Sequence, residues 1–92
     1  LLLISGRWKL IILWQLKDGA RRFTEMQKAI PHSSKKMLSQ QLREMEVDGL
    51  IARKRFAENP PRVDYWLTEL GESLLPVLKE LYAWGEAHHI IE

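Results

Sequence analysis

Residues 33–50, SSKKMLSQQLREMEVDGL, constrain the fold most, because they predict one helix with two different faces. Ser34 is a natural N-cap, since its hydroxyl can accept a hydrogen bond from an unpaired backbone N–H, and Gly49 is a natural residue to end the helix. At about 100° per residue, the apolar Leu38, Leu42 and Met45 fall on one side. The opposite side carries Lys36, Ser39, Gln40 and Arg43. The pattern predicts a helix that packs with one face and offers the other to a partner.

Two further helices are expected before this one. Residues 7–17, RWKLIILWQLK, are apolar nearly all round, which predicts a helix that is buried on more than one side and ends at Gly19. A brief extended segment, RRF, follows. Thr24 is expected to begin the second helix, because Thr24 and Gln27 have the spacing of a capping box, and Pro31 is expected to stop it.

Two strands are expected after the central helix, at residues 50–57 and 63–67. The sequence ENPPR between them predicts a proline-stiffened turn, so the strands should form a hairpin with a projecting tip. Thr68 is expected to cap a last helix, which either kinks at Pro76 or begins again there.

The order of these elements is helix, short strand, helix, helix, strand, wing, strand, helix. It predicts a mainly α fold with a small β-hairpin wing, a winged helix-turn-helix formed by residues 1–92 as a single domain. In that fold, the polar side of the helix at residues 33–50 is the side that enters a DNA major groove.

The charge distribution is uneven although the net charge is only +2. Residues 1–57 hold twelve Lys or Arg against five Asp or Glu, a balance of +7. Residues 58–92 hold two against seven, a balance of −5. This asymmetry predicts that one surface faces a polyanion.

Several classes of protein are disfavoured by what the sequence lacks. The 92 residues contain no cysteine, which excludes a disulfide framework or a thiolate zinc site within them and fits a cytoplasmic location. No apolar run approaches the roughly 18 residues of a membrane span, so no membrane partner is expected. No Ser/His/Asp arrangement, phosphate-binding glycine loop or metal-ligand spacing is found, so we expect no enzyme, no cofactor and no metal.

Four stretches closely resemble the HxlR-type regulators, bacterial winged-helix transcription factors related to the MarR group. They are ISGRWKLIILWQL, RRFTEM, KKMLSQQLREMEVDGLI and PPRVDYWLTELGESLLPVL, in the family's order and spacing. The resemblance implies a homodimeric DNA-binding repressor or activator, whose partners can include a small-molecule effector. Where the family usually has a glycine before the recognition helix, this chain has His32-Ser33, and Trp66 stands where a small polar residue is usual.

The residues expected to bind DNA come from three places. On the central helix, the Gln40 amide can pair with adenine and the Arg43 guanidinium with guanine. Wing cations are expected on phosphates or in the minor groove, with Arg62 favoured because two prolines stiffen the turn beside it. The second helix offers its N-terminal turn to phosphates. The full set is Ser34, Lys35, Lys36, Ser39, Gln40, Arg43, Arg53, Arg55, Arg62, Arg22 and Thr24.

Two alternatives stay open for this surface. Its polar residues could form an ordinary solvated helix face, or the chain could be a winged-helix protein-interaction module without DNA binding. Lysines are poor anchors for a protein partner, which favours DNA.

The terminal helices carry more apolar residues than one small core can bury, and such patches usually mark interfaces. We therefore expect the first and last helices to form a homodimer interface with two-fold symmetry. The residues expected there are Leu2, Leu3, Ile4, Trp8, Leu78, Leu81, Tyr82 and Trp84.

Overall fold

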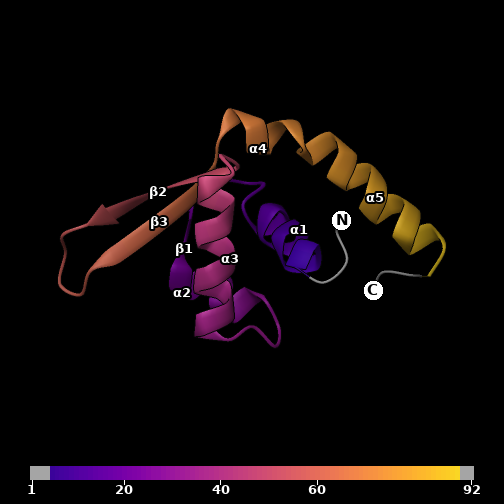
Figure 1. The fold of residues 1–92 in the computed structure, drawn as a ribbon. Helices are drawn as coiled ribbons and strands as arrows, with labels where there is room; N and C mark the ends of the chain where they lie inside the picture. The colour runs from indigo at the N-terminus through magenta and orange to yellow at the C-terminus, as the bar shows by residue number, and fades with distance from the viewer. Residues whose placement is uncertain (1–4, 90–92) are drawn as a thin grey trace.

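The computed structural model describes residues 5–89, and its elements follow the order of a winged helix-turn-helix (Figure 1). The helices are α1 (Ser5–Gln15), α2 (Phe23–Ala29), α3 (Lys35–Val47), α4 (Glu69–Ser73) and α5 (Leu75–Ala87). The strands are β1 (Arg21–Arg22), β2 (Ile51–Phe56) and β3 (Arg62–Leu67). The predicted fold class, mainly helical with a small hairpin wing, is confirmed.

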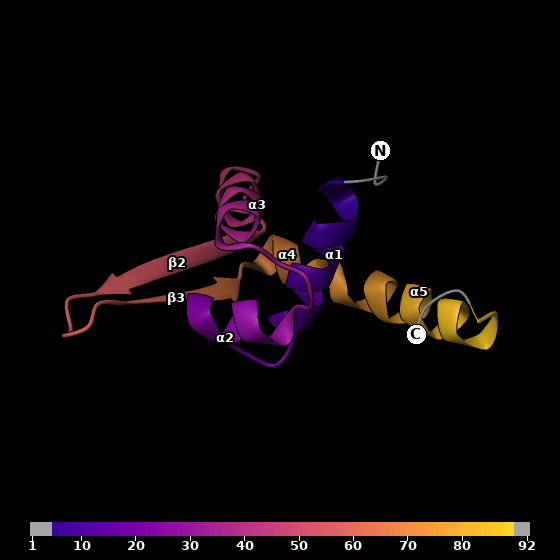
Figure 2. The ribbon, with the colours of Figure 1, turned by 90° about the horizontal axis from the view of Figure 1, so that it is seen from below.

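The three strands form one antiparallel sheet in the order β1-β3-β2. The register of the hairpin runs from Ile51 opposite Leu67 to Phe56 opposite Arg62. Directly opposite residues share a face of a sheet. One face therefore buries Ile51, Tyr65 and Leu67 against the helices. The hairpin projects from the body on the side opposite to α5, as two perpendicular views show (Figures 1 and 2).

The core is one cluster to which every larger element contributes. The first two helices and the turn after them contribute Ile12, Leu13 and Leu16 of α1, Met26 of α2, and Ile30. The other members are Leu38, Leu42 and Met45 of α3, Ile51 of β2, Tyr65 and Leu67 of β3, and Leu78 of α5. The face of α3 predicted to pack does so, since Leu38, Leu42 and Met45 are each at most 1% exposed. The opposite face of α3 therefore stays at the surface.

Both predicted boundaries of α3 are confirmed. The Ser34 hydroxyl oxygen accepts a hydrogen bond from the Met37 N–H at 3.0 Å. Gly49 follows the helix with φ +80°, a conformation that is cheap for glycine.

The predicted start of α2 at Thr24 is wrong. The helix begins at Phe23, and Arg22 is its N-cap. Arg22 pairs with Asp64 in the sheet, which holds its backbone extended, and its N–H donates to Glu25 Oε1 at 2.7 Å. Glu25, rather than Gln27, therefore completes the cap.

The last helical segment divides in two. The Thr68 hydroxyl oxygen accepts a hydrogen bond from the Gly71 N–H at 3.2 Å and so caps α4. A second helix, α5, then begins with Pro76 in its first turn, so of the two predicted outcomes the chain restarts. Thr68 also fastens the base of the hairpin, because its hydroxyl donates to Gly49 O at 2.6 Å and its N–H to Leu50 O at 3.1 Å.

The apolar residues of α5 are shared between the core and the surface. Leu78 is 3% exposed and belongs to the core, so little of its surface is left for the predicted dimer interface. Tyr82 is half-buried and stacks on Trp14 with 4.5 Å between ring centroids, and Trp8 is also half-buried.

A different part of α5 lies open. Val77, Leu81 and Trp84 are 65%, 42% and 53% exposed, and Leu70 and Leu74 extend this apolar surface onto α4 and the joint with α5. The predicted interface residues Leu2, Leu3 and Ile4 lie outside the described residues.

Candidate nucleic-acid interface

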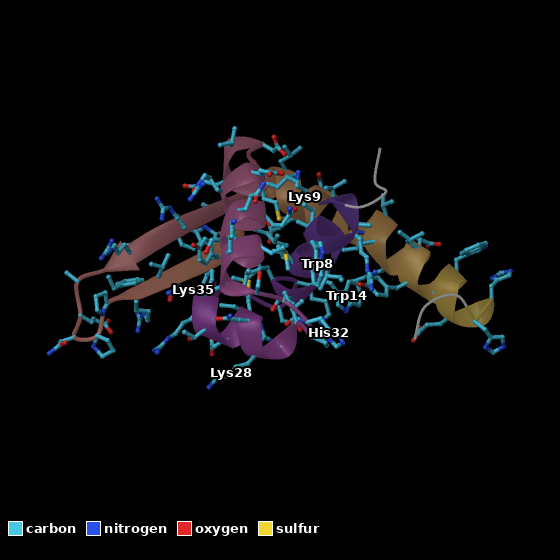
Figure 3. All side chains as sticks on the ribbon, turned by 60° about the horizontal axis from the view of Figure 1, so that its bottom comes forward. Trp8, Lys9, Trp14, Lys28, His32 and Lys35 are labelled. Carbon is cyan, nitrogen blue, oxygen red and sulfur yellow. The ribbon has the colours of Figure 1, made fainter. Side chains whose placement is uncertain are left out.

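The exposed face of α3 carries the polar residues that the sequence predicts there. Lys36, Ser39, Gln40 and Arg43 line one surface hollow together with Glu44. Figure 2 looks nearly along α3 and shows that this helix projects beside the hairpin. Lys35 begins the helix and is exposed (Figure 3). The Ser34 oxygen accepts the cap hydrogen bond, and its hydroxyl hydrogen remains available for donation to a ligand.

Two wing arginines lie on the same side as this face. In the register of the hairpin, Arg53 lies opposite Tyr65, and Arg55 lies opposite Val63. Both arginines are therefore on the sheet face that packs against the helices at the base of the hairpin. Arg53 Nε reaches α3, where it pairs with Glu46 Oε1 at 3.2 Å. The structure therefore brings α3 and β2 together into one basic surface.

A second hollow lies where α3 meets the wing. It is lined by Ser39, Arg43, Glu46, Arg53 and Tyr65. Burial raises the pKa of the Tyr65 hydroxyl above its ordinary value of 10.0, while Arg53 opposes the rise. The hydroxyl is therefore protonated at neutral pH and can donate a hydrogen bond to an anion in the hollow.

Arg62 lies elsewhere, on the opposite face of the wing. It shares that face with Phe56, and its guanidinium lies 4.3 Å from the Phe56 ring centroid. Its Nη1 is 3.4 Å from Glu58 Oε2, and its Nε is 3.2 Å from Asp64 Oδ1 without hydrogen-bond alignment. Two carboxylates thus neutralise the wing cation that the sequence favoured most.

Of the two residues predicted to contact DNA at the start of α2, Arg22 is set apart from the α3 surface. Arg22 lies opposite Asp64, so it shares the sheet face of Arg62, and Thr24 is exposed in the first turn of α2. Lys28 is exposed on the same helix (Figure 3). The structure therefore groups the α3 residues with Arg53 and Arg55, and it does not group them with Arg62 and Arg22.

The turn between α2 and α3 has an unusual backbone. His32 has φ +62°, in the left-handed region that disfavours side chains with a Cβ. The Ser33 hydroxyl holds the turn to the end of α2 by donating to Ile30 O at 2.8 Å, with Gln27 O at 3.3 Å. A glycine before the recognition helix, which is usual in HxlR-type regulators, would adopt this φ without strain.

Sequence reasoning missed three charged residues of this surface. Glu46 pairs with Arg53, and Lys9 Nζ of α1 pairs with Glu44 Oε1 of α3 at 2.9 Å. Glu44 also accepts a hydrogen bond from Gln40 Nε2 at 3.4 Å. The spacing of Gln40 and Glu44, four residues apart on a helix, is a signal that could have found their contact. No local signal could have found Lys9.

Within residues 5–89, no three His, Asp or Glu side chains are placed to hold a metal ion. None of the helices in this part of the chain is long and apolar enough to cross a membrane.

The sequence model of the HxlR-like helix-turn-helix family matches residues 3–91. The chain belongs to this family. It is a helix-turn-helix transcriptional regulator, and its named relatives are regulators too, in keeping with the expected non-enzymatic role.

Two of these relatives show how much of the chain is shared. The HTH-type transcriptional regulator YkvN of Bacillus subtilis (strain 168) is 49% identical over 82 residues, which are 89% of this chain and 70% of YkvN. An HTH-type transcriptional regulator of Methanothermobacter thermautotrophicus is 47% identical over 85 residues, which are 92% of this chain and 65% of that protein. The chain thus spans about two thirds of the length of such relatives.

Solved structures of similar proteins share the fold. A regulator of the MarR family from Porphyromonas gingivalis W83 has a TM-score of 0.85 and 41% identity, covering 89% of this chain and 80% of its own. The redox regulator HypR in its reduced form has a TM-score of 0.84 and 39% identity, covering 89% and 81%. These likenesses confirm the winged-helix fold and the relation to the MarR group.

Proposed function

We propose that this HxlR-family regulator binds double-stranded DNA in the cytoplasm as a homodimer, at an inverted-repeat operator. In each subunit, residues 1–92 act as one domain, with α3 in the major groove and the wing on the backbone or the minor groove. The observation that carries the proposal is the hollow shared by α3 and the wing. It sets Arg43 and Arg53 beside the hydroxyls of Ser39 and Tyr65, a combination that suits a phosphate and the base edges next to it.

The contacts divide by chemistry. Gln40 and Arg43 are proposed to contact base edges, because an amide matches adenine and a guanidinium matches guanine. Phosphate contacts hold the protein in register without selecting sequence, and the cations proposed to make them are Lys35, Lys36, Arg53 and Arg55.

The homodimer is proposed to form through α5 and the N-terminal helix. This proposal is supported by the exposed apolar surface at Val77, Leu81 and Trp84, which is unusual for a protein that is monomeric in solution. A two-fold axis would place the two recognition helices on half-sites about 10 base pairs apart, or a multiple of that, in inverted orientation.

Substitutions on α3 test the DNA contacts. Arg43→Ala and Gln40→Ala should each weaken binding to a selected operator by about 1–3 kcal/mol and relax the preference at one position of each half-site. Lys79→Ala on α5 is the control, because it removes an exposed cation far from the wing (Figure 1). Unchanged operator affinity in both α3 variants would show that this helix does not contact the bases.

Sedimentation at micromolar concentration tests the dimer. The wild type should sediment as a dimer, and Val77→Glu with Trp84→Glu should give a folded monomer, because charges cannot be buried unpaired. Ala83→Glu adds a charge to α5 away from this apolar stripe and should stay dimeric. A wild-type monomer would refute the proposal.

A protein-interaction module without DNA binding is the competing function. The basic surface of α3 and β2 favours DNA, since protein-docking surfaces more often expose aromatic or aliphatic anchors. Gel-shift titration against random duplex at two salt concentrations separates the two, because phosphate contacts make the affinity fall as salt rises.

The signal that regulates DNA binding is proposed not to be the oxidation of a cysteine thiol within these residues. HypR is named a redox regulator, whereas these 92 residues contain no cysteine to oxidise. DNA binding by this chain should therefore resist mild diamide, and a loss that thiol reverses would contradict this.

A further inference from the structure

A chain of contacts links α1 to the exposed face of α3. Lys9 Nζ lies 2.9 Å from Glu44 Oε1, and Glu44 Oε2 accepts from Gln40 Nε2 at 3.4 Å. We propose that Lys9 and Glu44 are positioning residues, which fix the orientation of the Gln40 amide and so make it select adenine. This inference rests on the proposed binding of DNA through α3.

The first step is the charge of Glu44. The hydrogen bond from Lys9 is the main cause that lowers the pKa of the Glu44 carboxyl, followed by the hydrogen bond from Gln40. Glu44 is therefore ionised at neutral pH. An ionised carboxylate can only accept hydrogen bonds, so it takes the NH₂ side of the Gln40 amide and repels the carbonyl side.

The second step is what Gln40 then presents to DNA. An amide NH₂ group has two N–H bonds, and the one that points away from the carbonyl can be given to Glu44. The other lies on the same edge as the carbonyl oxygen. That edge pairs with adenine in the major groove, since the oxygen accepts from N6 and the N–H donates to N7. Guanine presents two acceptors there, O6 and N7, and matches this edge poorly.

The third step is the role of Lys9. Without the ammonium group, Glu44 would stand uncompensated in a surface that meets phosphates, and its carboxylate would be free to turn away from Gln40. The amide could then adopt either orientation. Lys9 comes from α1, outside the helix-turn-helix itself, so it supports base selection without touching a base.

The alternative is that Lys9 and Glu44 form only an exposed ion pair between two helices. Such a pair contributes little to folding. The two roles differ in one observable, because a merely structural pair changes affinity for all sequences alike, whereas a positioning pair changes the preference at one base position.

The experiment compares variants of the full chain on a panel of duplexes. Gln40→Ala first identifies the operator position that Gln40 reads, and that position is then varied through all four base pairs. Lys9→Met should reduce the adenine preference there by about fivefold or more, the lower range for one bidentate base contact. Lys9→Arg should retain the preference, because the guanidinium keeps a positive charge beside the Glu44 carboxylate. In the double variant Lys9→Met with Gln40→Ala, the preference should fall no further than with Gln40→Ala alone.

Lys17→Met is the matched control. It also removes a lysine from an exposed ion pair, with Asp18 at 3.1 Å, but that pair lies just after α1 and does not reach α3. It should leave the preference unchanged, and melting curves show whether each variant is folded.

Two results overturn the inference while the proposed function stands. One is a Lys9→Met variant that loses affinity equally for all four base pairs. The other is a Gln40→Ala variant that changes no position. A wild type that fails to distinguish its selected operator from random duplex refutes the proposed function itself, and this inference falls with it.

Discussion

The ion pair between Glu46 and Arg53 gives the sharpest test of how the basic surface meets DNA. Its atoms lie 3.2 Å apart, with Arg53 53% and Glu46 39% exposed. The carboxylate competes with any phosphate for the same guanidinium. We therefore expect Glu46→Gln to strengthen DNA binding, because the neutral amide releases Arg53 for a phosphate.

The magnitude follows from the geometry. An exposed pair of this kind stabilises the fold by about 0–1 kcal/mol, so the variant should remain folded. One additional phosphate contact steepens the dependence of log K on log salt by about 0.9, which at about 0.15 M salt corresponds to an affinity roughly fivefold higher. The gain should be equal on operator and random duplex, since phosphates carry no sequence information.

The assay is a binding titration at three or more salt concentrations, on operator and on random duplex. Glu80→Gln is the matched control, because it removes the same charge from α5, at the opposite end of the molecule from the wing (Figure 1). An unchanged or weaker affinity in Glu46→Gln would refute the competition between Glu46 and phosphate. An equal gain in Glu80→Gln would show that net charge alone is responsible.

Three further substitutions test the fold by denaturant unfolding. Leu42→Ala should lower the free energy of unfolding by about 2–5 kcal/mol, since Leu42 is 1% exposed and a cavity would remain; a smaller loss would mean that the site collapses. Gly71→Ala should cost about 1–3 kcal/mol despite the better helix propensity of alanine, because its Cβ would collide with the Leu50 carbonyl that accepts the Thr68 N–H. His32→Gly should stabilise by up to about 1 kcal/mol, since glycine adopts φ +62° without strain; a destabilised variant would show that the imidazole makes contacts that outweigh this strain.

Local signals were sufficient for α3. A serine that can cap a helix, a glycine that can end one and an apolar stripe between them act over a few residues, so they predicted its bounds and its buried face. The start of α2 was missed because it depends on a tertiary contact. The pairing with β3, far away in the chain, ends at Arg22, so the extended segment stops one residue earlier than predicted and the helix begins at Phe23.

The residues of the candidate site were likewise predictable only where local sequence signals place them. The exposed polar face of α3 followed from periodicity, whereas the grouping of the wing arginines required the register of the hairpin, which places Arg53 and Arg62 on opposite faces. Val77 and Leu78 are adjacent apolar residues of α5, and the apolar surface of this helix is wider than the core that receives it. The packing of α5 on the body, which depends on residues far away in the chain, buries Leu78 and leaves Val77 exposed.

The hydrogen bonds of Thr68 at the base of the hairpin fix the point about which the wing can tilt. The Thr68 hydroxyl and N–H hold the carbonyls of Gly49 and Leu50, just after α3 and just before β2. Six residues of strand extend about 20 Å from that point, so a tilt of about 10° moves the tip by about 3.5 Å. A small change in the hydrogen bonds of Thr68 would therefore move the wing tip by several ångströms, although no wing residue is altered.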